Sequence, residues 1–325
     1  MNDTYFVTGA LGCIGAWVVR HLLERGDRPV VFDVGGDPRR LRDVLPADGL
    51  ARVQFVHGDI TDLEATKRAV AGCRPRAIIH LAGLQVPFCR QDPALGARVN
   101  VLGTIHVFEA ALAAGVGRVA YASSAAVFGP SEDDGTAVTE AVATAPVTHY
   151  GVYKQANEGT GRIYWLEKKL SSVGLRPLTV YGVGRDQGMT AGPTTAMKAA
   201  VVGRPYEIAF SGPTDFHYVA DTAAAFVMGA DGGPPGAHVF NLHGDTVDVA
   251  DVVRAIEAEC PEAKGRITVK GGRIPIPAHL DDGAIRKIYP QLPHTGLAVG
   301  VKATIARFRE LHAAGSLDTR DLPAR

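Results

Sequence analysis

The sequence contains little cysteine, no excess of either charge and no long apolar run. Its four cysteines are scattered over 325 residues without a CxxC or zinc-binding spacing: Cys13, Cys73, Cys89 and Cys260. Isolated thiols of this kind are typical of reducing compartments. The 34 Lys and Arg residues balance 34 Asp and Glu residues, so the basic surplus typical of nucleic-acid-binding proteins is missing.

No stretch of about 18 uninterrupted apolar residues occurs, so the sequence predicts no transmembrane helix. The chain opens Met1-Asn2-Asp3, without a basic region before its first apolar run, which is not the pattern of a secretory signal peptide. None of the 11 histidines forms an HExxH or comparable pair, so we predict no metal site. We expect a cytoplasmic protein that acts on a small molecule, with neither a nucleic acid nor a membrane as partner.

The first half of the sequence has a regular alternation of short apolar runs and longer amphipathic segments. Such alternation predicts an α/β fold in which helices cover both faces of a parallel sheet. Each crossover between parallel strands should be right-handed. The predicted strands are residues 5–7, 29–32, 53–56, 77–81, 118–121 and 170–178, and the predicted helices between them are residues 14–24, 62–71, 99–114 and 150–168.

Beyond residue 181 the pattern changes to short elements rich in Gly and Pro, and helices are predicted again at 220–228, 247–259 and 298–312. We therefore expect two domains. Residues 1–180, rejoined by a segment at about 215–243, would form a doubly wound sheet, and residues 181–214 and 244–325 a smaller α/β substrate-binding domain. The last residues, 316–325, are polar, and we expect them to be loosely held.

A glycine-rich loop follows the first predicted strand and opens the first predicted helix: Thr8-Gly9-Ala10-Leu11-Gly12-Cys13-Ile14-Gly15. In this setting the glycine spacing is that of a dinucleotide-binding loop. Gly9 permits the tight turn, Gly12 lets backbone approach a pyrophosphate, and Gly15 allows close helix packing. The helix N-terminus then offers unpaired N–H groups to the phosphates. The predicted cofactor contacts in this loop are Gly9, Leu11, Gly12, Cys13, Ile14 and Gly15.

An acidic residue, Asp33, ends the second predicted strand. A carboxylate at that place accepts hydrogen bonds from the adenosine ribose hydroxyls, whereas its charge would repel a 2′-phosphate. The sequence therefore favours NAD. Arg39 and Arg40 follow shortly afterwards and leave NADP open as an alternative, because arginine is the side chain that accommodates a 2′-phosphate.

Two further motifs give the sequence a specific resemblance. Tyr150 and Lys154 are four residues apart on a predicted helix and so share one face, and Ser123 and Ser124 follow the fifth predicted strand. Together with the glycine loop, they resemble the extended short-chain dehydrogenase/reductase family in its NAD-dependent epimerase/dehydratase branch, from the N-terminus to about residue 242. Other matching segments are Gly58-Asp59-Ile60, His80-Leu81-Ala82-Gly83, Asn100-Val101-Leu102-Gly103-Thr104, Arg176-Pro177, Val180-Tyr181-Gly182 and Phe216-His217-Tyr218-Val219.

The resemblance implies a Rossmann-type sheet and a catalytic set of Ser124, Tyr150 and Lys154. A free tyrosine has a pKa of about 10, too high for a base at neutral pH. The Lys154 ammonium and the positive nicotinamide of oxidised NAD favour the phenolate, which removes the alcohol proton as hydride leaves the carbon. The resemblance gives Lys154 a further hydrogen bond to the nicotinamide ribose. It gives Ser124, in preference to Ser123, the role of orienting the substrate oxygen.

The resemblance also implies cofactor contacts outside the glycine loop. It places Asp59 and Ile60 against the adenine, and Leu81, Ala82 and Gly83 along the phosphates and ribose. Asn100 matches the helix-stabilising asparagine of the family, and we include it among the predicted cofactor-site residues. The helices predicted at 99–114 and 150–168 resemble the family's dimer-forming pair, so we expect a homodimer.

Three positions depart from the pattern of the family's nucleotide-sugar epimerases. Thr179 occupies the place of a usual asparagine, Thr214 that of a usual arginine, and Gln85 that of a lysine common in galactose epimerases. A diphosphate without cationic partners loses charge-assisted hydrogen bonds of about 1.5–3 kcal/mol each, although Arg185 or Arg204 remain as substitutes. The predicted substrate contacts are Gln85, Ser124, Ala125, Thr148, His149, Thr179 and Arg185.

Three functions are compatible with these residues. The first hypothesis is NAD-dependent dehydrogenation of a secondary alcohol in a small polyhydroxy substrate, such as a sugar, aldonate or lactone. The second is a nucleotide-sugar epimerase, in which hydride leaves and returns within one site. A dehydratase would need an Asp-Glu pair where Ala125 and Ala126 occur. A distant third alternative is an NAD-binding sensor without catalysis, a class that commonly lacks the Tyr or the Lys.

Overall fold

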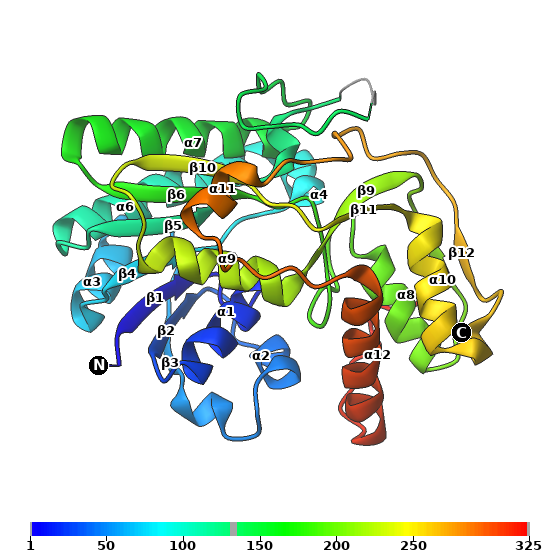
Figure 1. The fold of residues 1–325 in the computed structure, drawn as a ribbon. Coiled ribbons are helices and arrows are strands. Elements are labelled where there is room, and N and C mark those ends of the chain that lie inside the picture. Colours follow the sequence, from blue (N-terminus) through cyan, green and yellow to red (C-terminus); the bar gives the residue numbers. More distant parts are fainter. Residues whose placement is uncertain (1, 131–134, 324–325) are drawn as a thin grey trace.

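The centre of the molecule is a parallel sheet of seven strands in the order β10-β6-β5-β4-β1-β2-β3 (Figure 1). The computed structural model describes residues 2–130 and 135–323. Chain order runs outward in both directions from the β1 and β4 pair, which confirms the predicted α/β fold with a doubly wound sheet. The strands are β1 (Thr4–Thr8), β2 (Arg28–Asp33), β3 (Gln54–His57), β4 (Ala77–His80), β5 (Arg118–Ala122), β6 (Ser171–Arg176) and β10 (Ala237–Asn241).

Helices cover both faces of this sheet because its central strands are apolar on both sides. Alternate residues of β1 serve different cores: Tyr5 and Val7 pack with α1 and α9, whereas Phe6 packs with α3 and α6. Polar caps fix where two of these helices begin, since Asp62 accepts from the Ala65 N–H and Thr148 from the Gly151 N–H. The helices are α1 (Cys13–Glu24), α3 (Leu63–Cys73), α6 (Gly103–Ala113), α7 (His149–Lys168) and α9 (Val219–Asp231).

A smaller group of elements lies to the right of the sheet in Figure 1. It contains a three-stranded sheet, β11-β9-β7, and a two-stranded sheet, β12-β8. Its strands are β7 (Thr179–Tyr181), β8 (Tyr206–Ile208), β9 (Pro213–Tyr218), β11 (Asp245–Asp248) and β12 (Ile267–Val269), and its helices α8 (Gly192–Val201), α10 (Val249–Glu259) and α12 (Leu297–Ala313). Shorter helices elsewhere are α2 (Arg39–Val44), α4 (Val86–Gln91), α5 (Pro93–Ala97) and α11 (Gly283–Ile288).

The chain returns from this smaller group to the large sheet through α9 and β10. Strand β10 pairs with β6 along its whole length, from Ala237 beside Ser172 to Asn241 beside Arg176. We therefore propose the two-domain division expected from the sequence. Strand β9, which falls inside the predicted returning segment, pairs instead with β7 and β11 of the smaller sheet.

Two predicted helices differ in detail from the observed ones. The segment predicted as one helix at 99–114 begins as a π-helical stretch, Arg98–Leu102, before α6. The segment predicted from residue 247 is a strand up to Asp248, and α10 starts at Val249 because Asp248 caps it reciprocally with Asp251.

The tail is held more firmly than its polarity predicts, so our expectation of a loose end is wrong for residues 316–323. Asp318 pairs with Arg39, and both carboxylate oxygens of Asp321 accept from the Lys198 ammonium, at 2.9 and 2.8 Å. Leu322 is buried. Polar residues that find partners on the folded surface are ordered by them, which composition alone does not reveal.

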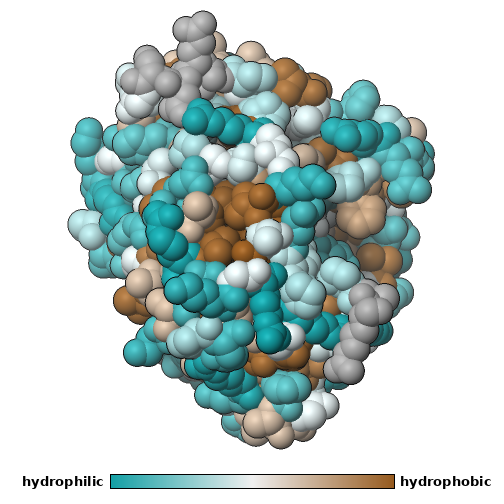
Figure 2. Space-filling model, turned by 90° about the vertical axis from the view of Figure 1, so that its right-hand side faces the viewer, coloured by the Kyte–Doolittle hydropathy of each residue, from teal (hydrophilic) through white to brown (hydrophobic). Residues whose placement is uncertain are grey.

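The face of the molecule shown in Figure 2 is mostly hydrophilic. Figure 2 shows one face, on which a small group of apolar side chains is surrounded by hydrophilic residues. Over the described ranges, no helix has the length and apolar character required to cross a membrane.

Candidate active site

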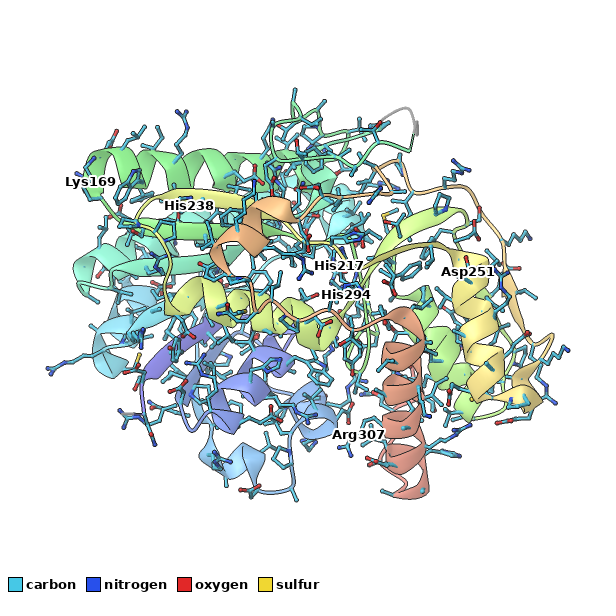
Figure 3. The ribbon with its side chains drawn as sticks, viewed as in Figure 1. Lys169, His217, His238, Asp251, His294 and Arg307 are labelled. Atoms are coloured by element: carbon cyan, nitrogen blue, oxygen red, sulfur yellow. The ribbon has the colours of Figure 1, made fainter. Side chains whose placement is uncertain are left out.

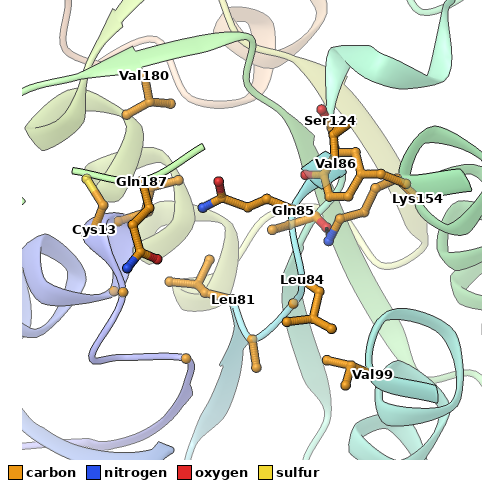
Figure 4. Close-up of a pocket in the computed structure, with 18 of the residues that line it drawn as sticks. Cys13, Leu81, Leu84, Gln85, Val86, Val99, Ser124, Lys154, Val180 and Gln187 are labelled. Carbon is orange, nitrogen blue, oxygen red and sulfur yellow. Dashed lines mark hydrogen bonds between the residues drawn. The ribbon is translucent and has the colours of Figure 1, made fainter. Parts of the chain in front are cut away.

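A cavity of about 890 Å³ lies where the strands of the large sheet end. Its wall includes residues that follow or end β1, β2, β3, β4, β5 and β6, and the carboxyl edge of a parallel sheet is where such folds bind ligands. In the close-up of Figure 4, Ser124 and Lys154 lie toward one end and Cys13 toward the other, with Gln85 between them.

The glycine loop fits tightly under the neighbouring strand end. Gly9 has a φ of +66°, and a Cβ on it would lie 2.5 Å from the backbone nitrogen of Ala82. A Cβ on Gly15 would lie 2.5 Å from the carbonyl oxygen of Gly9. Both positions therefore require glycine, one for conformation and close approach and the other for close approach alone. The glycines of this loop line the cavity, so its backbone is accessible to a ligand there.

The N-terminus of α1 faces this cavity without a side-chain cap. The cap position is occupied by Gly12, which has no side chain to accept from the first N–H groups of the helix. Cys13, Ile14 and Gly15 of the first turn line the cavity. The first N–H groups of a helix have no partner within it, and the helix dipole favours an anion there. A pyrophosphate fits this arrangement. Burial raises the pKa of the Cys13 thiol to about 12, so this side chain stays uncharged at neutral pH.

Asp33 lies at the same end of the cavity and is tied to the loop backbone. Its carboxylate accepts hydrogen bonds from the N–H of Leu11 at 3.0 Å and from the N–H of Gly35 at 2.9 Å. The carboxylate is thus fixed in place by β2 and by the glycine loop, as a ribose-binding acid needs to be.

The other predicted cofactor residues divide into cavity wall and support. Asp59, Ile60, Leu81, Ala82 and Gly83 line the cavity. Asn100 is buried behind the wall, where its amide donates to the carbonyl oxygens of Leu84 at 3.1 Å and Gly96 at 3.0 Å. Its Oδ1 would be 2.7 Å from a Cβ on Gly83. Asn100 therefore supports the wall.

Ser124, Tyr150 and Lys154 meet on one wall of the cavity. Ser124 follows β5, and the other two come from the first turns of α7. The Lys154 ammonium donates to the carbonyl oxygen of Ala122 at 2.8 Å and lies 5.5 Å from the centre of the Tyr150 ring. The four-residue spacing on a helix brings both side chains to the end of β5, as the sequence predicts.

The electrostatics of this set differ from the expectation that Lys154 lowers the pKa of the tyrosine. Burial raises the pKa of Tyr150, and the hydrogen bond from Ser124 and the charge of Arg185 oppose that rise without reversing it. Burial lowers the pKa of Lys154 to about 8. Burial therefore disfavours the charged form of each side chain, but a pKa of about 8 still leaves Lys154 mostly protonated at neutral pH.

His80 lies behind the cavity wall, where its ring bonds to two threonine hydroxyls. The hydroxyl of Thr104 donates to the carbonyl of Asn100 at 2.6 Å, so it accepts from Nε2 of His80 at 3.0 Å. Nδ1 then accepts from the hydroxyl of Thr8 at 2.7 Å. Burial, with the charge of Lys154, lowers the pKa of His80 to about 3, so the ring is neutral and acts in the fold.

Ser123 has a different environment from Ser124. Its hydroxyl donates to Glu158 at 2.5 Å, and Glu158 also forms two bonds of 2.7 Å with the guanidinium of Arg176. This buried group links β5, β6 and α7. The Ser124 hydroxyl accepts a backbone N–H, that of Ala126 at 3.2 Å, besides its bond to Tyr150.

The predicted substrate residues are not all brought together. Gln85, Ser124, Thr148 and Arg185 line the cavity. Ala125 is fully buried and His149 is exposed, stacked 6.1 Å from the Tyr153 ring. Thr179 is also fully buried, and its hydroxyl bonds to that of Thr214 at 2.9 Å. The structure therefore places these three side chains outside the cavity wall.

Several cavity residues were not expected from the sequence. They come from segments without a motif: Arg90 and Leu95 after β4, and Ile274, Pro275 and Ile276 after β12. Only tertiary folding brings the 274–276 segment to the cavity. Arg39 and Arg40 stand out in the sequence for their charge, but nothing in it indicates their partners.

A cluster of histidines lies outside the cavity, around the buried Asp215. His243 bonds to its carboxylate at 2.7 Å, and His217 lies 3.7 Å from it. That bond raises the pKa of His243. His294, labelled in Figure 3, contacts Asp245 at 3.1 Å, and its ring stacks 6.4 Å from that of His243. Among the described residues, no group of three or more His, Cys, Asp or Glu side chains is arranged to hold a metal ion.

Known proteins resemble this chain over almost its whole length. A family model described as the NAD dependent epimerase/dehydratase family matches residues 5–242. The UDP-glucose 4-epimerase of Mycolicibacterium smegmatis is 31% identical over 314 residues, which cover 93% of this chain and 97% of that protein. The UDP-glucose 4-epimerase of Thermus thermophilus, solved with NAD, has a TM-score of 0.79 and 25% identity, covering 94% of this chain and 99% of that one.

A third similar structure, MoeE5 in complex with UDP-glucuronic acid and NAD, has a TM-score of 0.78 and 28% identity, with coverage of 94% and 99%. The family resemblance, the enzyme class and NAD as cofactor are thereby confirmed. This match agrees with the site, which has a glycine loop packed against the end of β4, an acid at the end of β2 and a wall with Ser124, Tyr150 and Lys154. The chain belongs to the NAD-dependent epimerase/dehydratase family.

Proposed function

We propose that the protein transfers a hydride between a secondary alcohol of a small polyhydroxy substrate and NAD. The observation that carries this proposal is the meeting of Ser124, Tyr150 and Lys154 on the wall of a cavity whose other end is the glycine loop. A cofactor that spans the cavity from the loop would bring its nicotinamide end to that wall.

Tyr150 is the proposed base. The Ser124 hydroxyl bonds to Tyr150 and so lies where it can also orient a substrate oxygen. Bound NAD⁺ supplies the hydride acceptor and a positive charge beside the phenol. The Lys154 ammonium donates to the carbonyl oxygen of Ala122 and so stays near the Tyr150 ring. There its positive charge favours the phenolate, against the rise in the pKa of Tyr150 that burial causes.

The preference for a substrate without a diphosphate rests on Thr179 and Thr214. Both side chains are buried and bond to each other, so neither is available to a substrate phosphate. A sugar, aldonate or lactone needs neutral hydrogen-bonding groups instead. Gln85 and Thr148 on the cavity wall supply neutral donors and acceptors to such hydroxyls.

A nucleotide-sugar epimerase is the second candidate, and a specific observation favours it. Arg90 and Arg185 line the cavity, so cationic side chains are present at other positions of the wall. The relative from M. smegmatis that matches nearly the whole chain is a UDP-glucose 4-epimerase. In that case hydride would return to the same carbon from the opposite face, and no net reduction of NAD would accumulate.

The two candidates differ in the fate of the hydride. Free sugars, aldonates, lactones and nucleotide sugars, each supplied with NAD⁺, should be compared for NADH formation and for epimeric product. Stoichiometric NADH from a nucleotide-free polyol supports the first candidate. An epimer formed from a nucleotide sugar without net NADH would replace it with the second.

A homodimer remains a prediction. Three apolar side chains on α7, Val152, Ile163 and Leu166, are exposed, at 46%, 41% and 53%. Apolar residues gathered on one helix are typical of a protein–protein interface. Sedimentation of the purified chain measures the assembly directly.

A further inference from the structure

A second acidic residue, Asp186, bonds to two arginines at the cofactor end of the cavity, although it does not itself line the cavity. It lies in the loop between β7 and α8, and its side chain is only 8% exposed. Arg39 and Arg40 enclose it from the first turn of α2. Both arginines line the cavity, as do Asp33 and the residues that follow β2.

The two guanidinium groups direct their donors to Asp186. Arg40 forms bonds of 3.1 and 2.6 Å to one carboxylate oxygen, and Arg39 forms a bond of 2.6 Å to the other. The third nitrogen of Arg40 donates to the carbonyl oxygen of Leu11 at 2.9 Å. Arg39 also pairs with Asp318 of the tail. Charge-assisted pairs of this geometry are strong and directional.

Other contacts fix the helix that carries these arginines. Arg307 on α12, labelled in Figure 3, donates to the carbonyl oxygen of Asp43 in α2 at 2.8 Å. The loop that carries Asp186 packs on the glycine loop, since a Cβ on Gly184 would lie 3.8 Å from Cα of Cys13. Asp186 and its two partners are thus held from both sides.

These contacts lie just after β2, where they bear on the choice between NAD and NADP. An arginine shortly after β2 is the group that accommodates the 2′-phosphate of NADP in this type of fold. Here two arginines occupy that region, and without a partner they would attract such a phosphate. Asp186 pairs with both arginines, and Asp318 pairs with Arg39 as well, so most of their donors are already taken. Asp33 alone therefore does not account for the preference for NAD.

We infer that Asp186 is a specificity residue for the cofactor: it withholds Arg39 and Arg40 from the adenosine 2′-position, and so makes the site select NAD over NADP. It acts through the two arginines and touches neither reacting atoms nor substrate. The inference rests on NAD binding alone and is independent of the substrate and of the role of Tyr150.

The test is calorimetric titration of the full-length protein with NAD⁺ and with NADP⁺, in the absence of substrate. For Asp186→Asn, the ratio of the NADP⁺ to the NAD⁺ dissociation constant should fall at least about tenfold, because one released charge-assisted hydrogen bond suffices for that factor. Asp186→Glu keeps the charge and should retain the wild-type preference. A structural defect would instead weaken both nucleotides together.

Asp37→Asn is the matched control, since Asp37 is an acid on the cavity wall that bonds to the exposed Arg42 and to the backbone N–H of Arg39, but to the guanidinium of neither Arg39 nor Arg40. It should change the ratio little, and an equal change would overturn the proposal in favour of bulk charge. Adding Arg39→Ala and Arg40→Ala to Asp186→Asn should abolish the gain in relative NADP⁺ affinity. If that gain persists in the triple variant, or if Asp186→Asn leaves the ratio of dissociation constants unchanged, the proposal is overturned.

Arg39→Ala gives a second measurement, which does not require Asp186→Asn to fold. If the arginines are withheld in the wild-type protein, Arg39→Ala alone should leave NADP⁺ affinity within about threefold of wild type, less than one charge-assisted hydrogen bond is worth. A tenfold loss would show that Arg39 already reaches the 2′-phosphate. Failure to bind either nucleotide would contradict both the family cofactor and the role of Asp186.

Discussion

The two ends of the cavity are built in different ways. At the cofactor end, we propose that backbone groups of one continuous loop do most of the binding, and a Cβ on Gly9 or on Gly15 of that loop would lie 2.5 Å from neighbouring backbone atoms. At the substrate end, side chains arrive from β4, β5, α7, the loop after β7 and the segment after β12. One end is encoded by a short motif, and the other only by the complete fold.

This difference predicts different sensitivities. A backbone site tolerates almost no change in its own residues, because an added atom meets backbone that cannot move away. A side-chain site assembled from separate segments loses one contact at a time. Substitutions at the two ends should therefore separate cofactor affinity from substrate affinity.

The largest effect is expected for Gly9→Ala. The new Cβ would meet the Ala82 backbone at 2.5 Å, and alanine at a φ of +66° costs about a further 1–2 kcal/mol. NAD⁺ affinity should fall by about a hundredfold or more, the equivalent of about 2.7 kcal/mol. Calorimetric titration measures it, with Gly36→Ala as control, since a Cβ on Gly36 meets nothing within 4 Å. Equal affinities in the two variants would contradict the backbone account.

The second effect concerns stability at low pH and His80, which lies beneath the cofactor end. Its pKa is about 3 in the folded protein, below the ordinary value of 6.5. Between these values the unfolded chain takes up a proton that the folded protein does not, so stability falls as pH falls. The slope from this residue is about 1.4 kcal/mol per pH unit.

Urea unfolding between pH 6.5 and 4 measures this slope for wild type and for His80→Gln. The variant should be less stable near neutral pH, because the Thr8 and Thr104 contacts change, but its pH dependence should be flatter. Identical slopes would mean that His80 does not titrate as proposed.

At the substrate end, Arg185→Gln should raise KM about tenfold, the loss expected for one charge-assisted contact, while NAD⁺ affinity changes little. Arg204→Gln is the matched control because Arg204 is not among the cavity-lining residues of the described chain. Steady-state kinetics with the substrate identified by the screen separate the two. An equal effect at both positions would argue that the cavity wall near Arg185 is not the substrate site.

The smallest effect is expected for Thr179→Val, outside the cavity. The change leaves the hydroxyl of Thr214 buried without its partner, at a cost of about 1–3 kcal/mol in stability. KM and kcat should not change. The double variant Thr179→Val with Thr214→Val should recover part of the stability, and a raised KM in either would restore Thr179 as a substrate contact.

The same contrast explains what could be predicted from the sequence. Strand and helix alternation indicated the sheet, and the glycine spacing indicated the cofactor loop, because both are local patterns tied to local geometry. The Tyr150 and Lys154 pair needed only helical periodicity to be placed together. The tail, the 274–276 wall and the partner of Arg39 and Arg40 depend on contacts between distant segments, which periodicity does not encode.

The misplaced substrate candidates show the same limit. Thr179 was chosen by its match to a family position, but which way a strand residue faces is set by register, and here Thr179 faces inward against Thr214. His149 is adjacent to Tyr150 in sequence yet is exposed to solvent, because neighbouring helix residues lie on different faces.

The central claim is that Tyr150 moves the proton while the glycine loop holds the cofactor. The most direct test is Tyr150→Phe, with hydride transfer followed in a single turnover and NAD⁺ affinity measured by titration. We predict a loss of at least about a hundredfold in the transfer rate, the range of general-base catalysis, with NAD⁺ affinity essentially unchanged. Transfer at a rate close to that of the wild-type protein would contradict the assignment.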